Sequence, residues 1–343
     1  MEIDEIYMRR ALQLAANGRG QTSPNPMVGA VIVCDGRIIG EGWHRRFGGP
    51  HAEVNAVRSV ENSEMLRRST IYVTLEPCSH YGKTPPCAKL LIDSGVSRVV
   101  VGSLDPNPKV AGRGVAMLRD AGAEVTVGVL DDECKALNRA FMTAQTLRRP
   151  YVMLKWACSS DGYLDCVREA GDPAPRFSTA ASMQAMHRLR GDFDGIMVGS
   201  RTVVNDDPQL RVRLFPGRSP RRIVIDRSGV LTADHRIFAG EKSLVYSSGH
   251  ALDDVAEVVE VEPGSGLSEI LADLFSKGMI SVMVEGGATL LQAFIDCGVW
   301  DEARVEISPV ELGRRGRCRM GLPQGAVMVE RFGSNDILHI RRV

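Results

Sequence analysis

The chain has 343 residues, about twice the length of a common single domain, so two domains are expected. Basic and acidic residues number 42 each, and this zero formal charge does not favour a nucleic-acid-binding protein. No apolar run reaches the ~18 residues that a membrane span needs, and the acidic start is unlike a signal peptide. We therefore expect a cytoplasmic protein with reduced thiols and with no membrane or nucleic-acid partner.

The first half alternates helical and strand patterns. An apolar stripe at helical spacing predicts a helix that begins at residue 3 and ends before Gly18. The apolar run 28–34, Asp35-Gly36 and the run 37–40 predict a β-hairpin. Further strands are expected over residues 70–75, 98–102 and 124–129, and further helices after residue 51 and over 86–94 and 112–121. Thr84 is expected to cap the helix over 86–94, with Pro85 at its first position. This order predicts an α/β sandwich on a mixed sheet.

Residues 147–150, Leu-Arg-Arg-Pro, are interpreted as a joint between domains 1–147 and 148–343. Beyond it the alternation restarts, which predicts a second α/β domain. Its strands are expected over residues 151–156, 195–198, 222–225, 243–245, 280–284 and 302–307, and its helices over residues 180–190, 266–277 and 289–298.

A group of metal-binding residue types stands in the first half. His51 opens a helix, Cys78 follows a strand after Pro77, and Cys87 begins another helix. Two thiolates and one imidazole suit Zn²⁺ and leave a fourth position for water, whose pKa falls towards ~7. Glu53 lies two residues from His51, so it is placed to move protons without binding the metal. This order of residues resembles that of the zinc deaminases, and one Zn²⁺ per chain is expected.

The spacing leaves alternatives open, because eight residues, 79–86, separate the two cysteines where two are usual. One alternative is a closed structural zinc site with His80 or His44 as fourth ligand, although such a site would not need Glu53. Another is a set of core thiols without metal.

The long spacer belongs to a set of motifs that resembles one family, the bifunctional deaminase/reductase of riboflavin biosynthesis. The motifs are Pro24-Asn25-Pro26-x-Val28-Gly29, Gly42-x-His44, His51-Ala52-Glu53 and Glu76-Pro77-Cys78-Ser79-His80-x-Gly82-Lys83-Thr84-Pro85-Pro86-Cys87. The resemblance implies a cytidine-deaminase-like α/β/α sandwich that removes the 2-amino group of 2,5-diamino-6-(5-phosphoribosylamino)pyrimidin-4(3H)-one. It also implies the residues that contact this substrate, which are Asn25, His44, His80, Lys83 and Asp105.

The second half is similar to the reductase part of the same family. It lacks Gly-x-Gly-x-x-Gly after a strand, which argues against a Rossmann domain. The similar stretches are 149–155, 160–162, 198–213 and Glu285-Gly286-Gly287. They imply a dihydrofolate-reductase-like α/β domain that uses NADPH to reduce the ribosyl group of the deaminated product to ribityl.

The resemblance also implies residue roles in this half. Cofactor contacts are expected at Thr202, Asp206 and Gly287, and substrate contacts at Lys155, Arg190, Leu210, Arg213 and Glu285. Guanidinium groups suit phosphate, while Lys155 and Glu285 are candidates to position the sugar or relay a proton. Residues 174–178 replace a Ser-x-Trp that many members carry. Arg201 and Arg227 are our candidates for binding the 2′-phosphate of NADPH.

Two other functions remain open at this point. One is a nucleoside or tRNA-base deaminase fused to a non-catalytic nucleotide-binding domain, and the other is a non-catalytic protein held together by zinc. The 79–86 spacer with Lys83 argues against the first and Glu53 against the second. The expected ligands are phosphorylated pyrimidines, and homo-oligomer formation is left open.

Overall fold

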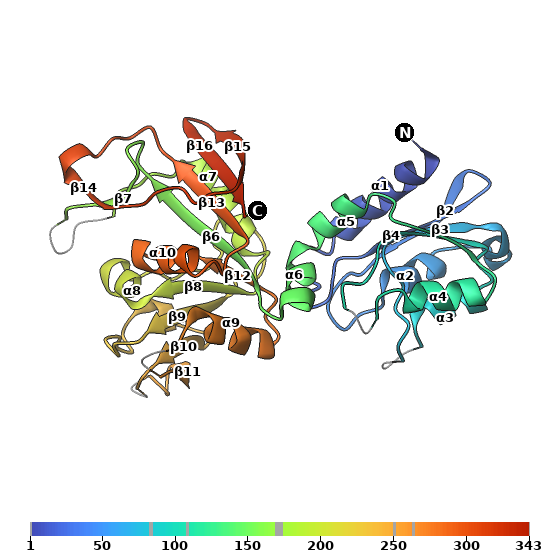
Figure 1. The fold of residues 1–343 in the computed structure, drawn as a ribbon, viewed down its shortest axis with the longest axis horizontal. Helices are drawn as coiled ribbons and strands as arrows, with labels where there is room; N and C mark the ends of the chain where they lie inside the picture. Colours follow the sequence, from blue (N-terminus) through green and yellow to red (C-terminus); the bar gives the residue numbers. More distant parts are fainter. Residues whose placement is uncertain are drawn as a thin grey trace. The chain divides into compact units, whose positions relative to one another are not determined.

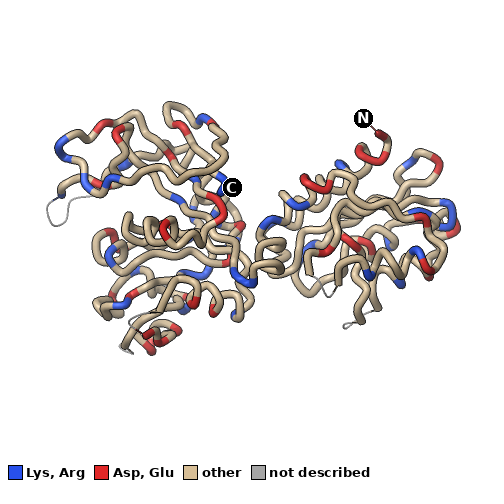
Figure 2. The backbone as a smooth tube through the Cα atoms, viewed as in Figure 1, with Lys and Arg blue, Asp and Glu red and all other residues tan. Residues whose placement is uncertain are grey.

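The computed structural model describes residues 2–81, 85–107, 110–168, 174–249, 252–262 and 265–342. The chain forms two compact units, Met1–Arg148 and Arg149–Val343 (Figure 1). Basic and acidic residues are interspersed along both units (Figure 2), in keeping with the zero formal charge. None of the described helices is long and apolar enough to span a bilayer.

The first unit is built on a five-stranded mixed sheet. Its strands are β1 (Gly29–Cys34), β2 (Arg37–Trp43), β3 (Thr70–Leu75), β4 (Arg98–Ser103) and β5 (Glu124–Val127). Its helices are α1 (Ile3–Ala16), α2 (Ala52–Arg58), the 3-10 helix η1 (Ser63–Arg68), α3 (Cys87–Asp93), α4 (Arg113–Asp120), α5 (Asp131–Leu137) and α6 (Arg139–Leu147). The sheet order is β2-β1-β3-β4-β5, with β3, β4 and β5 parallel.

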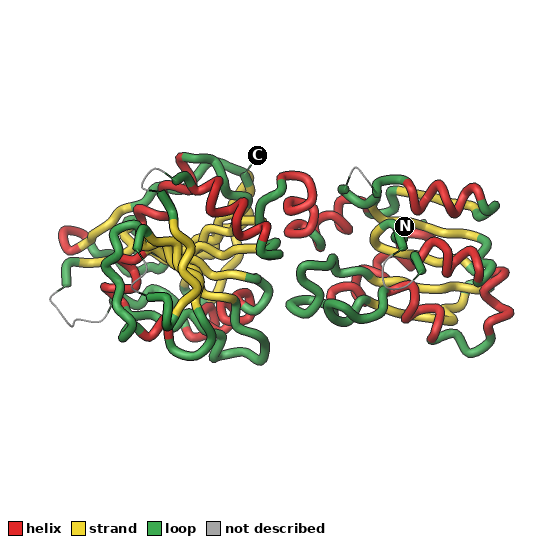
Figure 3. Tube along the Cα trace, turned by 90° about the horizontal axis from the view of Figure 1, so that it is seen from below, coloured by secondary structure: helices red, strands yellow, loops and turns green. Residues whose placement is uncertain are grey.

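Helices cover both faces of this sheet. Apolar side chains of α1 and α5 pack on one face, against Val31 of β1 and Val100 of β4. Those of α2, α3 and α4 pack on the other face, against Ile32 and Val99. The strand layer between helices is visible in the unit that carries the N-terminus (Figure 3). The expected α/β/α sandwich is confirmed, and so is the 28–40 hairpin, in which β1 pairs with β2.

One local expectation is wrong. Pro85 is not the first residue of a helix, because α3 begins at Cys87 and Pro86 is its extended N-cap residue, with φ −65° and ψ 151°. A residue that precedes proline is pushed out of the helical region, so Pro86 keeps Pro85 extended. The expected cap, Thr84, lies outside the described residues.

The second unit is built on a nine-stranded sheet and a separate two-stranded one. Its strands are β6 (Tyr151–Cys158), β7 (Tyr163–Cys166), β8 (Gly195–Gly199), β9 (Arg221–Asp226), β10 (Ser243–Ser247), β11 (Ala256–Glu260), β12 (Ser281–Val284), β13 (Glu302–Ile307), β14 (Gly316–Arg319), β15 (Ala326–Phe332) and β16 (Asn335–Arg341). Its helices are α7 (Ala180–Arg190), α8 (Ser200–Asp206), η2 (Arg236–Phe238), α9 (Leu267–Ser276), α10 (Ala288–Asp296) and η3 (Gly313–Arg315).

The large sheet has the order β11-β10-β9-β8-β12-β6-β13-β16-β15. Strands β11 to β13 in this order are parallel, whereas β16 and β15 are antiparallel additions at one edge. The chain runs from β8 outward to β11 and then returns to place β12 between β8 and β6. The carboxyl ends of β8 and β12 therefore lie side by side, which is where open parallel sheets bind ligands.

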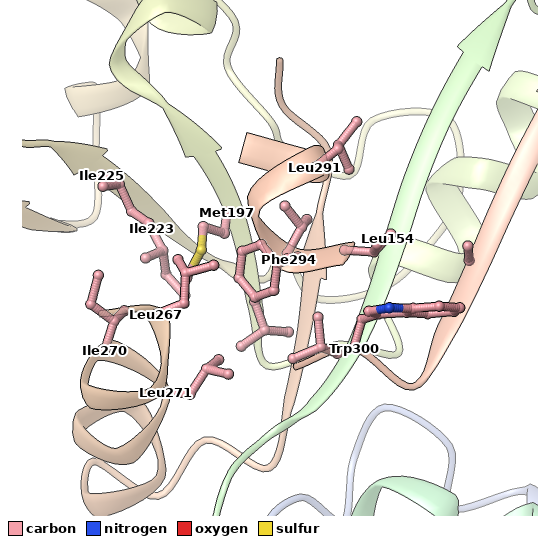
Figure 4. Close-up of a cluster of buried hydrophobic side chains, with 14 of the residues drawn as sticks. Leu154, Met197, Ile223, Ile225, Leu267, Ile270, Leu271, Leu291, Phe294 and Trp300 are labelled. Carbon is pink, nitrogen blue, oxygen red and sulfur yellow. The ribbon is translucent and has the colours of Figure 1, made fainter. Parts of the chain in front are cut away.

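Helices α9 and α10 cover one face of this sheet with apolar side chains (Figure 4). Phe294 of α10 is fully buried and lies among Leu154, Met197 and Leu291. Complete burial of such a side chain contributes roughly 1.5–3 kcal/mol. This core fixes the strands whose ends carry the second site.

Candidate active sites

The three expected metal ligands meet at one point of the first unit. His51 is the N-cap residue of α2, Cys78 follows β3 after Glu76-Pro77, and Cys87 is the first residue of α3. The His51 Nδ1 lies 3.7 Å from the Cys78 Sγ and 3.4 Å from the Cys87 Sγ. The Cys87 backbone N–H donates to the Cys78 Sγ at 3.2 Å, and the three ligand atoms all lie within 4.8 Å of one another.

These atoms fit a zinc ion. A tetrahedral ion with bonds of about 2.0–2.3 Å separates its ligand atoms by roughly 3.6 Å. The hydrogen bond from Cys87, and after it the one from His51, lowers the pKa of Cys78, so a thiolate is available. Within the described ranges only these three residues form such a group, and His44 is not among them. Three protein ligands and an open fourth position are typical of catalytic zinc.

Glu53 lies in the first turn of α2 and is 3% exposed. Burial, followed by the charge of Cys78, raises its pKa to about 7. A carboxyl group of this kind is suited to exchange protons at neutral pH.

Asn25 and His44 are brought together beside the metal ligands. The Asn25 Nδ2 lies 3.3 Å from the His44 Nε2, and the His44 Nδ1 lies 3.0 Å from the Pro50 carbonyl oxygen. The carbonyl accepts only from a protonated Nδ1, so the Nε2 of neutral His44 is the acceptor for Asn25. Burial lowers the pKa of His44, which favours this neutral form. The His44 ring meets that of His51 edge-on at 5.6 Å.

The other expected substrate contacts of this unit are more open. His80 is exposed just after Cys78, and Asp105 is partly buried just after β4. One Asp105 oxygen accepts from the Asn107 backbone N–H at 2.8 Å, and burial raises the pKa of Asp105. Lys83 lies outside the described residues.

Two buried residues hold these loops and were not assigned from sequence. Asn138 exchanges two 2.8 Å hydrogen bonds with the Met27 backbone, next to the Asn25 loop. Glu76 accepts four backbone N–H groups from the segment 105–115. Such side chain to backbone contacts leave no spacing pattern, although Glu76 does belong to the quoted Glu76-Pro77-Cys78 motif.

In the second unit, Thr202 and Gly287 lie at the carboxyl ends of β8 and β12. Gly287 has φ +56°, and a Cβ built on it would lie 3.3 Å from the Thr202 Oγ1. A Cβ on Gly286 would lie 2.7 Å from Val198. Both glycines therefore let the β12–α10 turn pack closely on β8, at the position where a dinucleotide is bound in parallel sheets.

Arg190 and Glu285 form a buried ion pair. The Arg190 Nη2 and Nε donate to the two Glu285 oxygens at 2.6 and 2.9 Å, and the side chains are 14% and 6% exposed. Burial raises the pKa of Glu285, but Arg190 and then Lys155 outweigh it and lower the pKa to about 2. Burial lowers the pKa of Lys155, which lies near this pair on β6.

The segment that carries Leu210 and Arg213 packs against the end of α7. The Arg213 backbone N–H donates to the His187 Nδ1 at 3.0 Å, and Arg190 reaches the Arg211 carbonyl at 3.5 Å. Leu210 is buried with φ +52°, while the Arg213 side chain is exposed. His187 was missed from sequence because it sits within an ordinary helical pattern.

The remaining residues of interest belong to the same unit. Asp206 accepts from the Arg168 Nη2 at 3.0 Å at the end of α8. Arg201 is exposed on α8, and Arg227 follows β9 and donates to the Ser265 carbonyl at 2.6 Å. Phe177, within the stretch that replaces Ser-x-Trp, is only 7% exposed.

The fold and the two sites define the class of protein: a zinc-binding deaminase unit followed by a reductase unit for a nicotinamide cofactor. Residues 1–103 match the model of the cytidine and deoxycytidylate deaminase zinc-binding region, and residues 150–332 match that of the RibD C-terminal domain. The chain belongs to the RibD family of riboflavin biosynthesis proteins, and it is an enzyme with deaminase and reductase parts.

The relatives match over nearly their whole lengths. The riboflavin biosynthesis protein RibD of Escherichia coli is 38% identical over 98% of this chain and 96% of its own, and that of Aquifex aeolicus is 39% identical over 91% and 88%. The crystal structure of a diaminohydroxyphosphoribosylaminopyrimidine deaminase/5-amino-6-(5-phosphoribosylamino)uracil reductase from Thermotoga maritima superposes with a TM-score of 0.90, at 37% identity and 99% coverage of both chains. Acinetobacter baumannii RibD gives 0.89 at 34% identity and 98% coverage of both.

Proposed function

We propose that the first unit hydrolyses 2,5-diamino-6-(5-phosphoribosylamino)pyrimidin-4(3H)-one and that the second unit reduces the product with NADPH. The first step breaks the bond to the 2-amino group, forms a carbonyl with oxygen from water and releases ammonia. The second transfers a hydride and a proton to the ribosyl group, which becomes ribityl. The observation that carries the proposal is the convergence of His51, Cys78 and Cys87 with buried Glu53 beside them.

We assign the metal to His51, Cys78 and Cys87. Zinc, when bound there, would activate water for attack on the pyrimidine. Glu53, buried two residues from His51, would take a proton from the water and deliver it to the ring nitrogen and the leaving amine. This assignment is tested by Glu53→Ala, which should keep zinc but lower the deamination rate by about 10²–10⁴-fold. Exposed Glu61→Ala is the matched control, and loss of zinc from Glu53→Ala would show that Glu53 is structural.

We propose that Asn25 and His44 contact the pyrimidine, that His80 and Lys83 contact the phosphate or a ring carbonyl, and that Asp105 contacts the ribose. The Asn25–His44 hydrogen bond supports this, because it leaves the Asn25 Oδ1 as an acceptor for a base edge.

We propose that Thr202, Asp206 and Gly287 hold NADPH at the carboxyl ends of β8 and β12. The close packing of Gly287 on Thr202 supports this position. Arg201 or Arg227 is assigned to the 2′-phosphate, since both follow the carboxyl ends of strands, β8 and β9. Replacing each by alanine should reduce the preference for NADPH over NADH; an unchanged preference would contradict the assignment.

We propose that the substrate of the second unit lies against Lys155, Arg190, Leu210, Arg213 and Glu285. Arg213 is a suitable phosphate ligand because its guanidinium is exposed. Lys155 and Glu285 lie buried together, where they can orient the sugar or relay the proton.

The two activities and their order can be tested together. The purified chain is incubated with the diaminopyrimidine ribosyl phosphate, with and without NADPH, and the products are identified by mass spectrometry. The deaminated ribosyl compound should form without NADPH, and the deaminated ribityl compound with it. Deamination that never leads to reduction would contradict the second half of the proposal, and no reaction at all would contradict both.

A further inference from the structure

Glu76 occupies an unusual position between the metal ligands and the Asp105 loop. It extends β3 by one residue, since its backbone N–H donates to the Ser103 carbonyl at 2.9 Å, and it precedes Pro77-Cys78. Its side chain is 5% exposed. Among the described residues no lysine, arginine or histidine forms an ion pair with it.

In the part of the chain that the structure describes, the Glu76 carboxylate is paired with backbone N–H groups and not with a cationic side chain. One Glu76 oxygen accepts from Asp105 at 3.2 Å and Gly112 at 2.9 Å. The other accepts from Gly114 at 2.9 Å and Val115 at 3.2 Å, in the first turn of α4. Through these four hydrogen bonds one buried side chain holds the backbone at Asp105, at Gly112 and in the first turn of α4.

Gly114 allows the start of α4 to pack directly on the backbone of Pro77. A Cβ on Gly114 would lie 2.0 Å from the Pro77 carbonyl oxygen, so α4 begins in direct contact with the chain that leads to Cys78. The metal-binding segment, the start of α4 and the backbone of Asp105 are thus joined through Glu76.

The Asp105 side chain is held by the same arrangement. One of its oxygens accepts from Asn107, and no residue within the described ranges donates a hydrogen bond to the other. Because the Asp105 backbone is fixed by Glu76, that second oxygen has a defined position relative to Cys78.

We propose that Glu76 is a positioning residue of the deaminase: it fixes Asp105 against the metal site so that Asp105 binds the substrate. This inference rests on the proposed function of the first unit. Among the described residues, no hydrogen bond joins the Glu76 side chain to His51, Cys78 or Cys87. It acts through the backbone N–H groups of Asp105, Gly112, Gly114 and Val115.

The main test is Glu76→Gln, which keeps the shape but offers an amide N–H₂ where one pair of backbone N–H groups needs an acceptor. We expect full zinc content, a KM for the diaminopyrimidine substrate raised about 10–100-fold and a kcat changed less than about threefold. Reduction of the deaminated intermediate by the same chain should be unchanged, which reports on folding. Loss of zinc, or a lower kcat at unchanged KM, would overturn the proposal.

A double-mutant cycle separates positioning from general support. If Glu76 acts through Asp105, Asp105→Asn should raise KM alone and Glu76→Gln should add little to it. Effects that multiply would overturn the proposal. Glu76→Asp, which keeps the charge but shortens the reach, provides a second variant with a smaller expected rise in KM. Asp226→Asn is the matched control, because Asp226 of the second unit likewise accepts backbone N–H groups, from Val230 and Leu231; deamination should be unaffected.

These outcomes are distinct from failure of the proposed function. If the unmodified chain does not deaminate the diaminopyrimidine, the function itself is wrong. If it does, and Glu76→Gln matches it in KM and kcat, only the role of Glu76 is wrong.

Discussion

Neutralising Glu285 should destabilise the second unit strongly. In Glu285→Gln the buried Arg190 guanidinium loses its counter-charge, along with at least one of two hydrogen bonds of 2.6 and 2.9 Å. Because the side chains are only 14% and 6% exposed, water compensates little. Breaking such a pair costs about 3–5 kcal/mol. For a unit of this size, such a loss of free energy lowers the melting temperature by about 6–20 °C.

Differential scanning calorimetry of the intact chain measures the effect. Glu269→Gln, an exposed position on α9, is the control and should change the free energy of unfolding by less than about 0.5 kcal/mol. Adding Arg190→Met to Glu285→Gln should recover part of the loss, since the unpaired charge is removed as well. A melting temperature for Glu285→Gln equal to that of the control would refute the reasoning. So would a double variant whose loss of stability equals the sum of the losses in the two single variants, Glu285→Gln and Arg190→Met.

Three further results are expected. A chelator should stop deamination and leave reduction of the deaminated intermediate intact; loss of both activities would contradict separate sites. The Arg98 hydrogen bond lowers the pKa of Asp4 below its ordinary 3.8, so this pair stabilises the fold above that pH and the stabilisation disappears as the pH falls through the lowered pKa. In urea titrations Asp4→Asn should therefore lower the free energy of unfolding by about 1–2 kcal/mol at neutral pH and by less as the pH falls below 3.8, whereas an equal loss at every pH would contradict this sign. Phe294 is fully buried, so Phe294→Ala should lower the free energy of unfolding by about 3–5 kcal/mol. Phe47 is exposed, so Phe47→Ala should lower it by less than about 0.5 kcal/mol, and similar losses for both variants would contradict the packing argument.

Local patterns were sufficient for much of the fold. The hairpin over residues 28–40 was predictable because a turn dipeptide separates two apolar runs, and the confirmed pairing of β1 with β2 follows that signal. The zinc-binding residue types were also visible in the sequence, since chemistry restricts them to a few kinds.

Elements with weak or irregular patterns were missed. No element was expected after residue 307, yet β15 and β16 close one edge of the large sheet. Most of β15 is exposed, and Val327, Met328 and Val329 follow one another without the alternation that marks a half-buried strand. The short helices α5, α6 and α8 were missed as well. The role of Glu76 was out of reach for another reason: its partners are backbone groups, which every residue has.

The place of β6 in its sheet has a consequence for synthesis on the ribosome. Strand β6 pairs with β12 and β13, and the paired residues are Tyr151 with Ser281 and Met153 with Glu302. The centre of the sheet therefore cannot form until residues 281 and 302 have left the ribosome. In the first unit, by contrast, every strand pairs with one that is near in sequence. Contacts between distant segments form late. The first unit can therefore fold while the second is still being translated, and the apolar strands β8 to β10 must remain unpaired with the centre of their sheet until almost the whole chain has been made.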